Sequence, residues 1–375
     1  MDFRFSEEQT LLGDSAGRFL RDQYGLDVRR AIIASEAGYS AEIWSQLADL
    51  GWLALPFGED VGGLEAGAVE TMIIMEALGS SLVVEPYLAN VVLTGGLIEA
   101  LGSDEQRQEI LPAVIAGKKM LAFAYSEPDA RYDLARVRVT AEKCGDGYKL
   151  DGHKSVVLNG LAADWLVVSA RTGGAHDEAE GISLFLVPGD AAGVERRGYA
   201  TLDSQRAAEI TFSGVELGAG ALLGEKDVAL APMEMAIDRA TAALAADAMG
   251  AMQALNQTTV EFLMTRKQFG RPIGSFQVLQ HRMTDMIMEY EQVKSLVYLA
   301  TLKLDAEPDE RKRAVSAAKV QVGRSGRMIG QNAVQMHGGM GVSDELNVGQ
   351  YFKRLTAIDA LFGNVDYHRR RFAAL

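Results

Sequence analysis

The pattern of apolar residues changes twice along the chain, and this change constrains the fold more than any other feature. Helical spacing runs through segments such as IWSQLADLGW and VETMIIMEALG until about residue 117. Short β-rich runs such as WLVVSAR and AEITFSGVEL, bounded by turn-forming residues, follow until about residue 227. Helical spacing then returns. The sequence therefore predicts three domains, at residues 1–117, 118–227 and 228–375, in an α+β fold that is mostly α.

Several local patterns add detail to this prediction. Ser6 followed by Gln9 is typical of a capping box at a helix start. The segment VRVTAEKCGDGYKLDG alternates around a CGDG turn and predicts a β-hairpin, so we expect the middle domain to be an antiparallel barrel or sandwich. In the last domain, the charged segment DAEPDERKR is expected to be a solvated connection between two long helices. The first of these helices should bury one face, formed by Met283, Met286, Ile287, Tyr290, Val293 and Val297.

Composition excludes several classes of function. The chain has 37 basic and 51 acidic residues, and its net charge of −14 argues against nucleic-acid binding. A single cysteine, Cys144, excludes an intramolecular disulfide, and the five histidines lack metal-ligand spacing, so we expect no metal site. No secretory signal and no apolar run of about 18 residues is found, so we expect a cytoplasmic protein without a membrane span.

Two motifs each have a structural and a functional interpretation. The segment RKQFGRPIGSFQ, residues 266–277, is either an exposed loop between helices or a site where Arg266 and Gln277 meet a phosphate or a polar ring. The segment HGGMG, residues 337–341, is either a glycine-rich helix exit or an anion-binding loop.

The motifs in their order resemble the acyl-CoA dehydrogenase family of flavoproteins over nearly the full length. They are GWLALPFGEDVGG, YSEP, DGHKSVVLNG, DRATAALAADAMG, RKQFG, QMHGGMG and LFGN. The resemblance implies an N-terminal helical domain, a central β-domain and a C-terminal four-helix bundle. It also implies FAD as the cofactor, lying between the β-domain and the bundle, with its adenine end reaching a neighbouring subunit.

The resemblance also assigns cofactor contacts. The residues matching those at the flavin ring are Phe123, Tyr125, Ser126, Val156 and Leu158. Most relatives have Trp and Thr at the positions of Val156 and Leu158, so this chain lacks an aromatic wall and a hydroxyl there. The residues matching those at the pyrophosphate and adenosine are Arg266, Phe269, Gln277, Gln335, Gly338 and Gly339.

The family reaction removes hydrogens from Cα and Cβ of an acyl-CoA thioester: a carboxylate takes the α proton while hydride passes to flavin N5. Most members carry that carboxylate as Glu in a YEGT-like motif, but this chain reads LFGN there, and Phe362 cannot accept a proton. Some members place the base on the helix that we expect to begin at Ile237, where Asp238 matches it. Arg239 matches a residue that braces the active-site loop. For both residues a structural role is the alternative, with Asp238 as a carboxylate at the helix N-terminus.

The substrate side of the resemblance rests on four positions. Arg131 and Tyr132 replace a small Gly-Ser pair near the thioester arm of CoA, and Phe362 and Gly363 match residues at the substrate. Arg131 is either a partner for a CoA phosphate or a distal carboxylate, or a solvated loop arginine.

Three functions follow from these observations. The first is FAD-dependent α,β-dehydrogenation of an acyl-CoA with a dicarboxylyl, branched or ring-bearing acyl group, using Asp238. The alternatives are a non-catalytic or half-site subunit of a heteromeric acyl-CoA dehydrogenase, and a flavin-containing acyl-CoA lyase. The expected partners are the acyl-CoA, further subunits in a homo- or heteromeric dimer or tetramer, and electron-transfer flavoprotein as electron acceptor.

Overall fold

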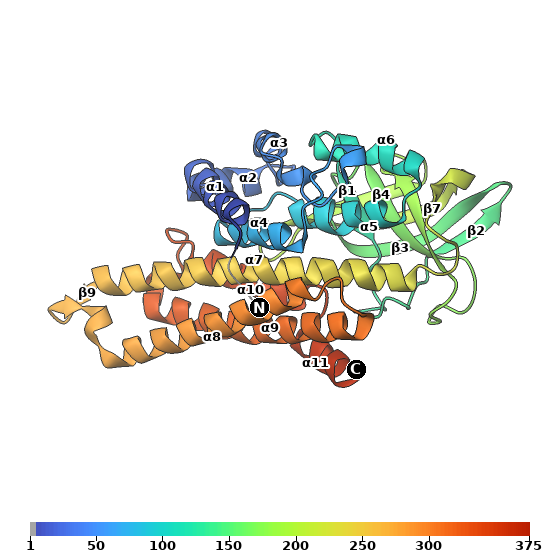
Figure 1. Ribbon diagram of the computed structural model, residues 1–375. Helices are drawn as coiled ribbons and strands as arrows, with labels where there is room; N and C mark the ends of the chain where they lie inside the picture. The colour runs from blue at the N-terminus through green and yellow to red at the C-terminus, as the bar shows by residue number, and fades with distance from the viewer. Residues whose placement is uncertain (1–4) are drawn as a thin grey trace. The chain divides into compact units, whose positions relative to one another are not determined.

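The computed structural model describes residues 5–375 (Figure 1). The chain divides into two compact units. The described residues up to Ala31, Ala68–Val83 and Thr241–Leu375 form what we call the bundle unit; Ile32–Gly67 and Val84–Ala240 form the sheet unit. Helices precede residue 118, the strands of the sheet lie between Leu121 and Leu223, and helices follow from Leu230. The division into three sequential domains remains a prediction.

The bundle unit is helical. It contains α1 (Glu7–Gln23), α4 (Ala68–Ser80), most of α7 (Leu230–Thr265), α8 (Gln277–Leu302), α9 (Pro308–His337), α10 (Val348–Ala360) and α11 (Val365–Ala373). Helix α9 packs against α8, α10 and α11 (Figure 1). The capping box is confirmed, because Ser6 Oγ accepts from the Gln9 N–H at 3.1 Å and Gln9 Oε1 accepts from the Ser6 N–H at 3.0 Å.

Two helical predictions need correction. On α8 the expected apolar face is buried except for Ile287, which is 45% exposed. At 100° per residue, Ile287 lies about 80° from the centre of the buried stripe, beyond the reach of the helices that cover it. The segment DAEPDERKR is only partly a connection, because α9 begins at Pro308. Proline suits this first helical position because the N–H that it lacks would have no partner there.

Glycines allow α4 and α7 to cross closely. A Cβ on Gly250 would lie 1.9 Å from the Glu76 carbonyl oxygen, and a Cβ on Gly79 would lie 2.0 Å from the Asp247 carbonyl oxygen. A buried ion pair connects α7 to α10, since Arg354 Nε donates to Asp247 Oδ1 at 3.0 Å and Nη2 donates to the other oxygen. The α4–α7 crossing thus depends on two glycines, and the contact between α7 and α10 depends on a buried ion pair.

The sheet unit contains shorter helices and one eight-stranded sheet. Its helices include α3 (Ala41–Asp49), a π-helix at Leu88–Gly95, α5 (Gly96–Leu101) and α6 (Asp104–Ile115), while α2 (Leu26–Ala34) begins in the bundle unit. The strands are β1 (Leu121–Ala124), β2 (Thr140–Cys144), β3 (Gly147–Leu158), β4 (Trp165–Arg171), β5 (Ile182–Pro188), β6 (Val194–Ala200), β7 (Arg206–Leu217) and β8 (Leu222–Leu223).

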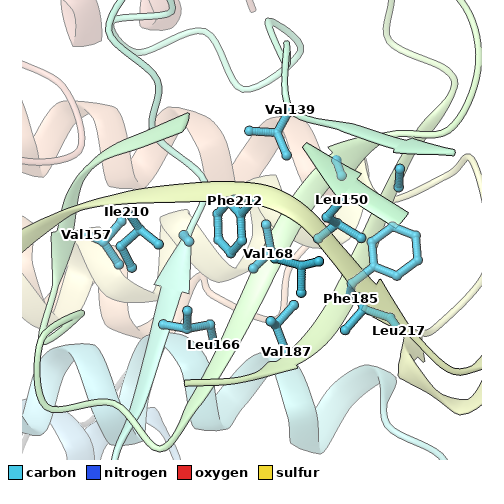
Figure 2. Close-up of a cluster of buried hydrophobic side chains, with 14 of the residues drawn as sticks. Val139, Leu150, Val157, Leu166, Val168, Phe185, Val187, Ile210, Phe212 and Leu217 are labelled. Carbon is cyan, nitrogen blue, oxygen red and sulfur yellow. The ribbon is translucent and has the colours of Figure 1, made fainter. Parts of the chain in front are cut away.

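The strand order is β6-β7-β3-β2-β4-β5-β8, with β1 pairing with β4. The expected hairpin is confirmed, because β2 and β3 pair antiparallel with Cys144 opposite Gly147. The sheet is not antiparallel throughout, since β1 runs parallel to β4. Side chains such as Leu150, Phe185 and Phe212 gather between the strands as the core of this unit (Figure 2).

Among the described helices, none combines the length and the apolar character needed to cross a bilayer.

Candidate active site

The segment expected to meet the flavin ring follows the end of β1. Phe123 is buried, and its ring centroid lies 5.0 Å from that of the half-buried Tyr125. The carbonyl of Ser126 accepts from the Ser155 N–H of β3 at 2.9 Å. The sheet unit therefore brings Phe123, Tyr125 and Ser126 next to the strand that carries the other two expected contacts.

Those two contacts lie where β3 becomes irregular. The register between β3 and β7 shifts between Lys154 and Val157, and Val156 has a φ of +52° with its side chain 45% exposed. A β-branched residue rarely adopts this conformation, so the bulge holds Val156 outward under strain. Leu158 is half-buried and lines a small cavity with Pro86 and Arg206.

A buried ion pair that the sequence analysis missed supports both segments. Lys154 is fully buried and donates from Nζ to the Tyr125 carbonyl at 3.2 Å, to Glu127 Oε1 at 2.7 Å and to Ser169 Oγ at 2.9 Å. Burial lowers the pKa of Lys154 to about 8, although Glu127 opposes this shift. Alternation along β3 was an available signal, because Lys154 is in phase with the inward Tyr148 and Leu150.

The candidate base lies on α7, in its sheet-unit part. Asp238 is fully buried, whereas Arg239 is exposed. The helix begins at Leu230 and not at Ile237, so Asp238 lies more than two turns inside it. The interpretation of Asp238 as an N-terminal carboxylate is therefore wrong, because the helix dipole acts within the first turn.

The expected substrate residues that follow the YSEP motif are more exposed to solvent than Asp238. Arg131 is exposed, with a φ of +52°, and Tyr132 is half-buried.

In the bundle unit, the expected adenosine and pyrophosphate residues lie on an exposed hairpin. Strands β9 (Lys267–Gln268) and β10 (Arg271–Pro272) follow Arg266 and precede Gln277, the first residue of α8. Phe269 and Gly270 form the tip with φ values of +52° and +79°, as in a type I′ turn. Phe269 is 89% exposed. An aromatic ring so fully solvated is available to a flat ligand.

The second group of adenosine residues lies beside this hairpin. Phe262, one turn before Arg266, stacks on His337 with ring centroids 4.3 Å apart. His337 ends α9 and is followed by Gly338 and Gly339, where an added Cβ would meet nothing within 4 Å. Gln335 is exposed in the last turn of the same helix. Arg266, Gly338 and Gly339 are all exposed, and the two glycines leave room for a ligand to approach the backbone.

The turn that replaces the family's glutamate motif joins α10 to α11. Phe362 is 5% exposed and has a φ of +59°, and Gly363 has a φ of +116°. Two buried residues that the sequence analysis missed, Lys319 and His368, donate to the carbonyls of this turn. Residue 362 is a phenylalanine, so this turn contains no side chain that could act as the base at that position. It presents only backbone groups and an apolar ring.

Within residues 5–375, no group of three or more His, Cys, Asp or Glu side chains is placed to hold a metal ion. Residues in each of the two units fit FAD. The sheet unit has the aromatic residues Phe123 and Tyr125 at and after the end of β1. The bundle unit has the exposed Arg266 and Phe269, and its loop of Gly338 and Gly339 leaves room for a phosphate.

Comparison with known proteins identifies the family of the chain. The models of the N-terminal, middle and C-terminal domains of acyl-CoA dehydrogenase match residues 6–118, 122–215 and 230–374. The L-prolyl-[peptidyl-carrier protein] dehydrogenase of a Serratia species is 28% identical over 383 residues, covering 100% of this chain and 97% of that protein.

Two solved structures match over the full chain. The ChsE4–ChsE5 complex from Mycobacterium tuberculosis has a TM-score of 0.90 at 27% identity, and the FAD complex of PigA has a TM-score of 0.92 at 27% identity. Each match covers 100% of this chain and 98% of the other. Since the three domain models together span nearly the whole sequence, the chain belongs to the acyl-CoA dehydrogenase family of oxidoreductases.

Proposed function

We propose that this chain is an FAD-dependent enzyme that removes hydrogens from Cα and Cβ of an acyl-CoA thioester. Family membership and the flavin-bound relative support the reaction class and the cofactor. When bound, FAD supplies the acceptor for the hydride that leaves Cβ. The segment from Phe123 to Ser126 would hold its ring, and Arg266 with Phe269 would hold the pyrophosphate and adenosine.

Asp238 is the base in this proposal, and its burial on α7 is the observation that carries it. A thioester α proton is only weakly acidic, so its removal needs a carboxylate in a site that excludes water. Aspartate is one methylene shorter than glutamate, so we expect the backbone or the substrate to shift to bring the α carbon within reach. Arg239 would brace the substrate side of the same helix.

The Phe362–Gly363 turn would contribute through its backbone. In the family, a backbone N–H beside the usual glutamate donates to the thioester carbonyl and stabilises the charge that grows on its oxygen. That donor does not depend on the side chain, so Phe362 preserves it while removing the carboxylate.

For the acyl group of the substrate we propose a dicarboxylyl chain. The stretches around RKQFGRPIGSFQ and YFKRLT resemble the small subunit of a pimeloyl-CoA dehydrogenase, which favours a dicarboxylyl chain. Arg131 and Tyr132 would then lie where the thioester arm or a distal carboxylate passes. Branched or ring-bearing acyl groups are the alternatives.

The test uses the purified chain, an artificial electron acceptor and a panel of acyl-CoA thioesters, including dicarboxylyl, branched and cyclic ones and one prolyl thioester. Bleaching of the flavin band and loss of two hydrogens by product mass spectrometry are the expected results. Asp238→Asn should lower kcat by about 10²-fold or more while FAD remains bound. Unchanged turnover in this variant would remove Asp238 from the mechanism, and a product without that mass loss would favour a lyase.

A second candidate, a half-site subunit of a heteromer, is favoured by Phe362 and by the likeness to the ChsE4–ChsE5 complex. Such a chain would be colourless and inactive alone, and yellow and active only with a paralogous subunit. A yellow oligomer of this chain alone, with turnover, would exclude it. Electron-transfer flavoprotein is the proposed physiological acceptor in either case, tested by its reduction in place of the dye.

A further inference from the structure

Two buried basic side chains donate hydrogen bonds to the backbone of the Phe362–Gly363 turn. The proposed mechanism does not use either of them. His368 of α11 donates from Nε2 to the Phe362 carbonyl at 3.1 Å. Lys319 of α9 donates from Nζ to the Gly363 carbonyl at 2.6 Å and to the Asp359 carbonyl at 3.0 Å. Side chains from two different helices therefore fix two successive carbonyls of one turn.

The contacts of His368 also define its tautomer. A carbonyl only accepts, so Nε2 carries the proton, and Nδ1, 3.2 Å from Ser316 Oγ, accepts from that hydroxyl. Burial, together with the nearby Lys319 and Arg371, lowers the pKa of His368 to about 3. The ring is therefore neutral near pH 7, with one donor facing one carbonyl.

The turn depends on such support because its backbone is unusual. Phe362 adopts a φ of +59°, which a residue with a side chain rarely does. An added Cβ on Gly363 would stand 2.6 Å from His368 Nε2, so glycine is what allows the imidazole to approach the turn. We call the pair Lys319 and His368 the clamp. The clamp requires glycine at position 363, because a side chain there would collide with His368.

Fixing the carbonyls leaves the opposite side of the turn available. Phe362 and Gly363 are both buried, and their turn follows the end of α10 at Ala360. The proposed function gives a backbone N–H of this turn the thioester carbonyl as its acceptor. Lys319 and His368 therefore act on the backbone from which that donor projects.

We propose that Lys319 and His368 are positioning residues that hold this turn so that one of its backbone N–H groups meets the thioester carbonyl of the substrate. The identity of the ligand rests on the proposed function, whereas the clamp rests on the contacts given above. The backbone of the turn thus stays useful to the reaction although its side chain at position 362 has no acid–base chemistry.

The test compares four variants of the FAD-loaded protein. Lys319→Met and His368→Leu remove a donor, His368→Gln keeps one, and Lys353→Met removes an exposed charge from α10 as the control. Because charge on the thioester oxygen grows in the transition state, kcat should fall about ten- to hundredfold in the first two, with KM changed less than about threefold. His368→Gln and Lys353→Met should keep kcat within about threefold of the unaltered enzyme.

Hydrogen exchange of a peptide covering residues 361–366 gives a readout that does not need turnover. It should accelerate in Lys319→Met and His368→Leu and stay unchanged in the other two variants. Unchanged exchange in His368→Leu, or equal losses of kcat in His368→Leu and His368→Gln, would overturn the inference. If the unaltered enzyme oxidises no thioester, the proposed function fails, and the exchange data alone then support or refute the clamp. If Lys319→Met does not fold, the two His368 variants decide.

Discussion

Lys154, Lys319 and His368 are basic side chains with almost no exposure to solvent. Each one is accompanied by acceptors: a carboxylate, a hydroxyl and a carbonyl for Lys154, and backbone carbonyls for Lys319 and His368. Burial lowers the pKa of Lys319 to about 7, and it also lowers the pKa values of Lys154 and His368. A buried polar or charged group is costly without hydrogen-bond partners, so these residues mark places where the backbone must be held.

The Lys154–Glu127 pair gives a first prediction. Lys154→Met leaves the Glu127 carboxylate buried without its cation, so the free energy of unfolding should fall by about 3–5 kcal/mol. FAD affinity should fall too, because the Tyr125 carbonyl loses its donor. Urea denaturation and fluorescence titration with FAD measure the two effects. Lys149→Met, on the exposed side of the same strand, is the control, and equal losses in both variants would contradict the prediction.

His368 gives a prediction about pH. Its pKa is about 3 in the folded state against 6.5 as the unperturbed value, so the unfolded chain binds the extra proton first as pH falls. The part of the stability that depends on neutral His368 is present above pH 6.5 and is lost as pH falls toward 3. His368→Gln should therefore lose less stability on acidification, by up to about 1.4 kcal/mol per pH unit. Urea midpoints measured from pH 7 to 5 test this, and parallel curves would contradict it.

For single residues, the sequence predicted the features that depend on near neighbours in the chain. The Ser6 cap depends on residues three apart and was found. Lys154 could have been found from strand alternation, but its partner Glu127 lies on a distant segment. The role of His368 depends on a turn conformation that no pattern in the sequence reports.

Among the elements, the crossing of α4 and α7 depends on glycine. Gly250→Ala would force a Cβ against the Glu76 carbonyl, so we expect a loss of about 1–3 kcal/mol in stability. Gly96→Ala is the matched control, since an added Cβ there meets nothing within 4 Å and alanine favours the helix. Thermal or urea unfolding measures both, and a neutral Gly250→Ala would mean that the helices separate without cost.

The β9–β10 hairpin allows binding to be separated from folding. Phe269→Asn suits the left-handed backbone at the tip and removes an 89% exposed ring, so the stability of the FAD-free chain should not fall. FAD affinity should fall by about tenfold or more if the ring stacks on adenine. Calorimetric titration measures the affinity, and unchanged binding would remove Phe269 from the cofactor site.

Element boundaries were harder to predict than element types. Helix α7 begins about two turns before Ile237, because Ala231 and Pro232 suit a first turn that apolar spacing does not reveal. The hairpin of β2 and β3 was found because its turn signal lies between alternating strands.

For the whole molecule, the expected cofactor residues are divided between two compact units, and the resemblance places the adenosine end of FAD against a neighbouring subunit. Removing FAD should therefore lower the melting temperature and shift the protein to smaller assemblies. Scanning calorimetry and light scattering measure these changes. Added FAD should reverse both, whereas FMN, which lacks the adenosine half, should not restore the assembly. Full restoration by FMN would contradict the predicted placement.

The order of helical, β and helical segments was visible in the sequence because periodicity is a local property. The family followed from motifs in register. The catalytic assignment did not follow in the same way, because the familiar acid is absent and Asp238 must be judged by burial, which only the folded chain reveals.

Cys144 ends β2 at the β2–β3 hairpin, and it is exposed. Since it is the sole thiol in the sequence, one maleimide-linked spin label or fluorophore attaches there at a known ratio of one per chain. Dipolar spectroscopy between labels would then count how many copies of this polypeptide share a particle, without any mutagenesis.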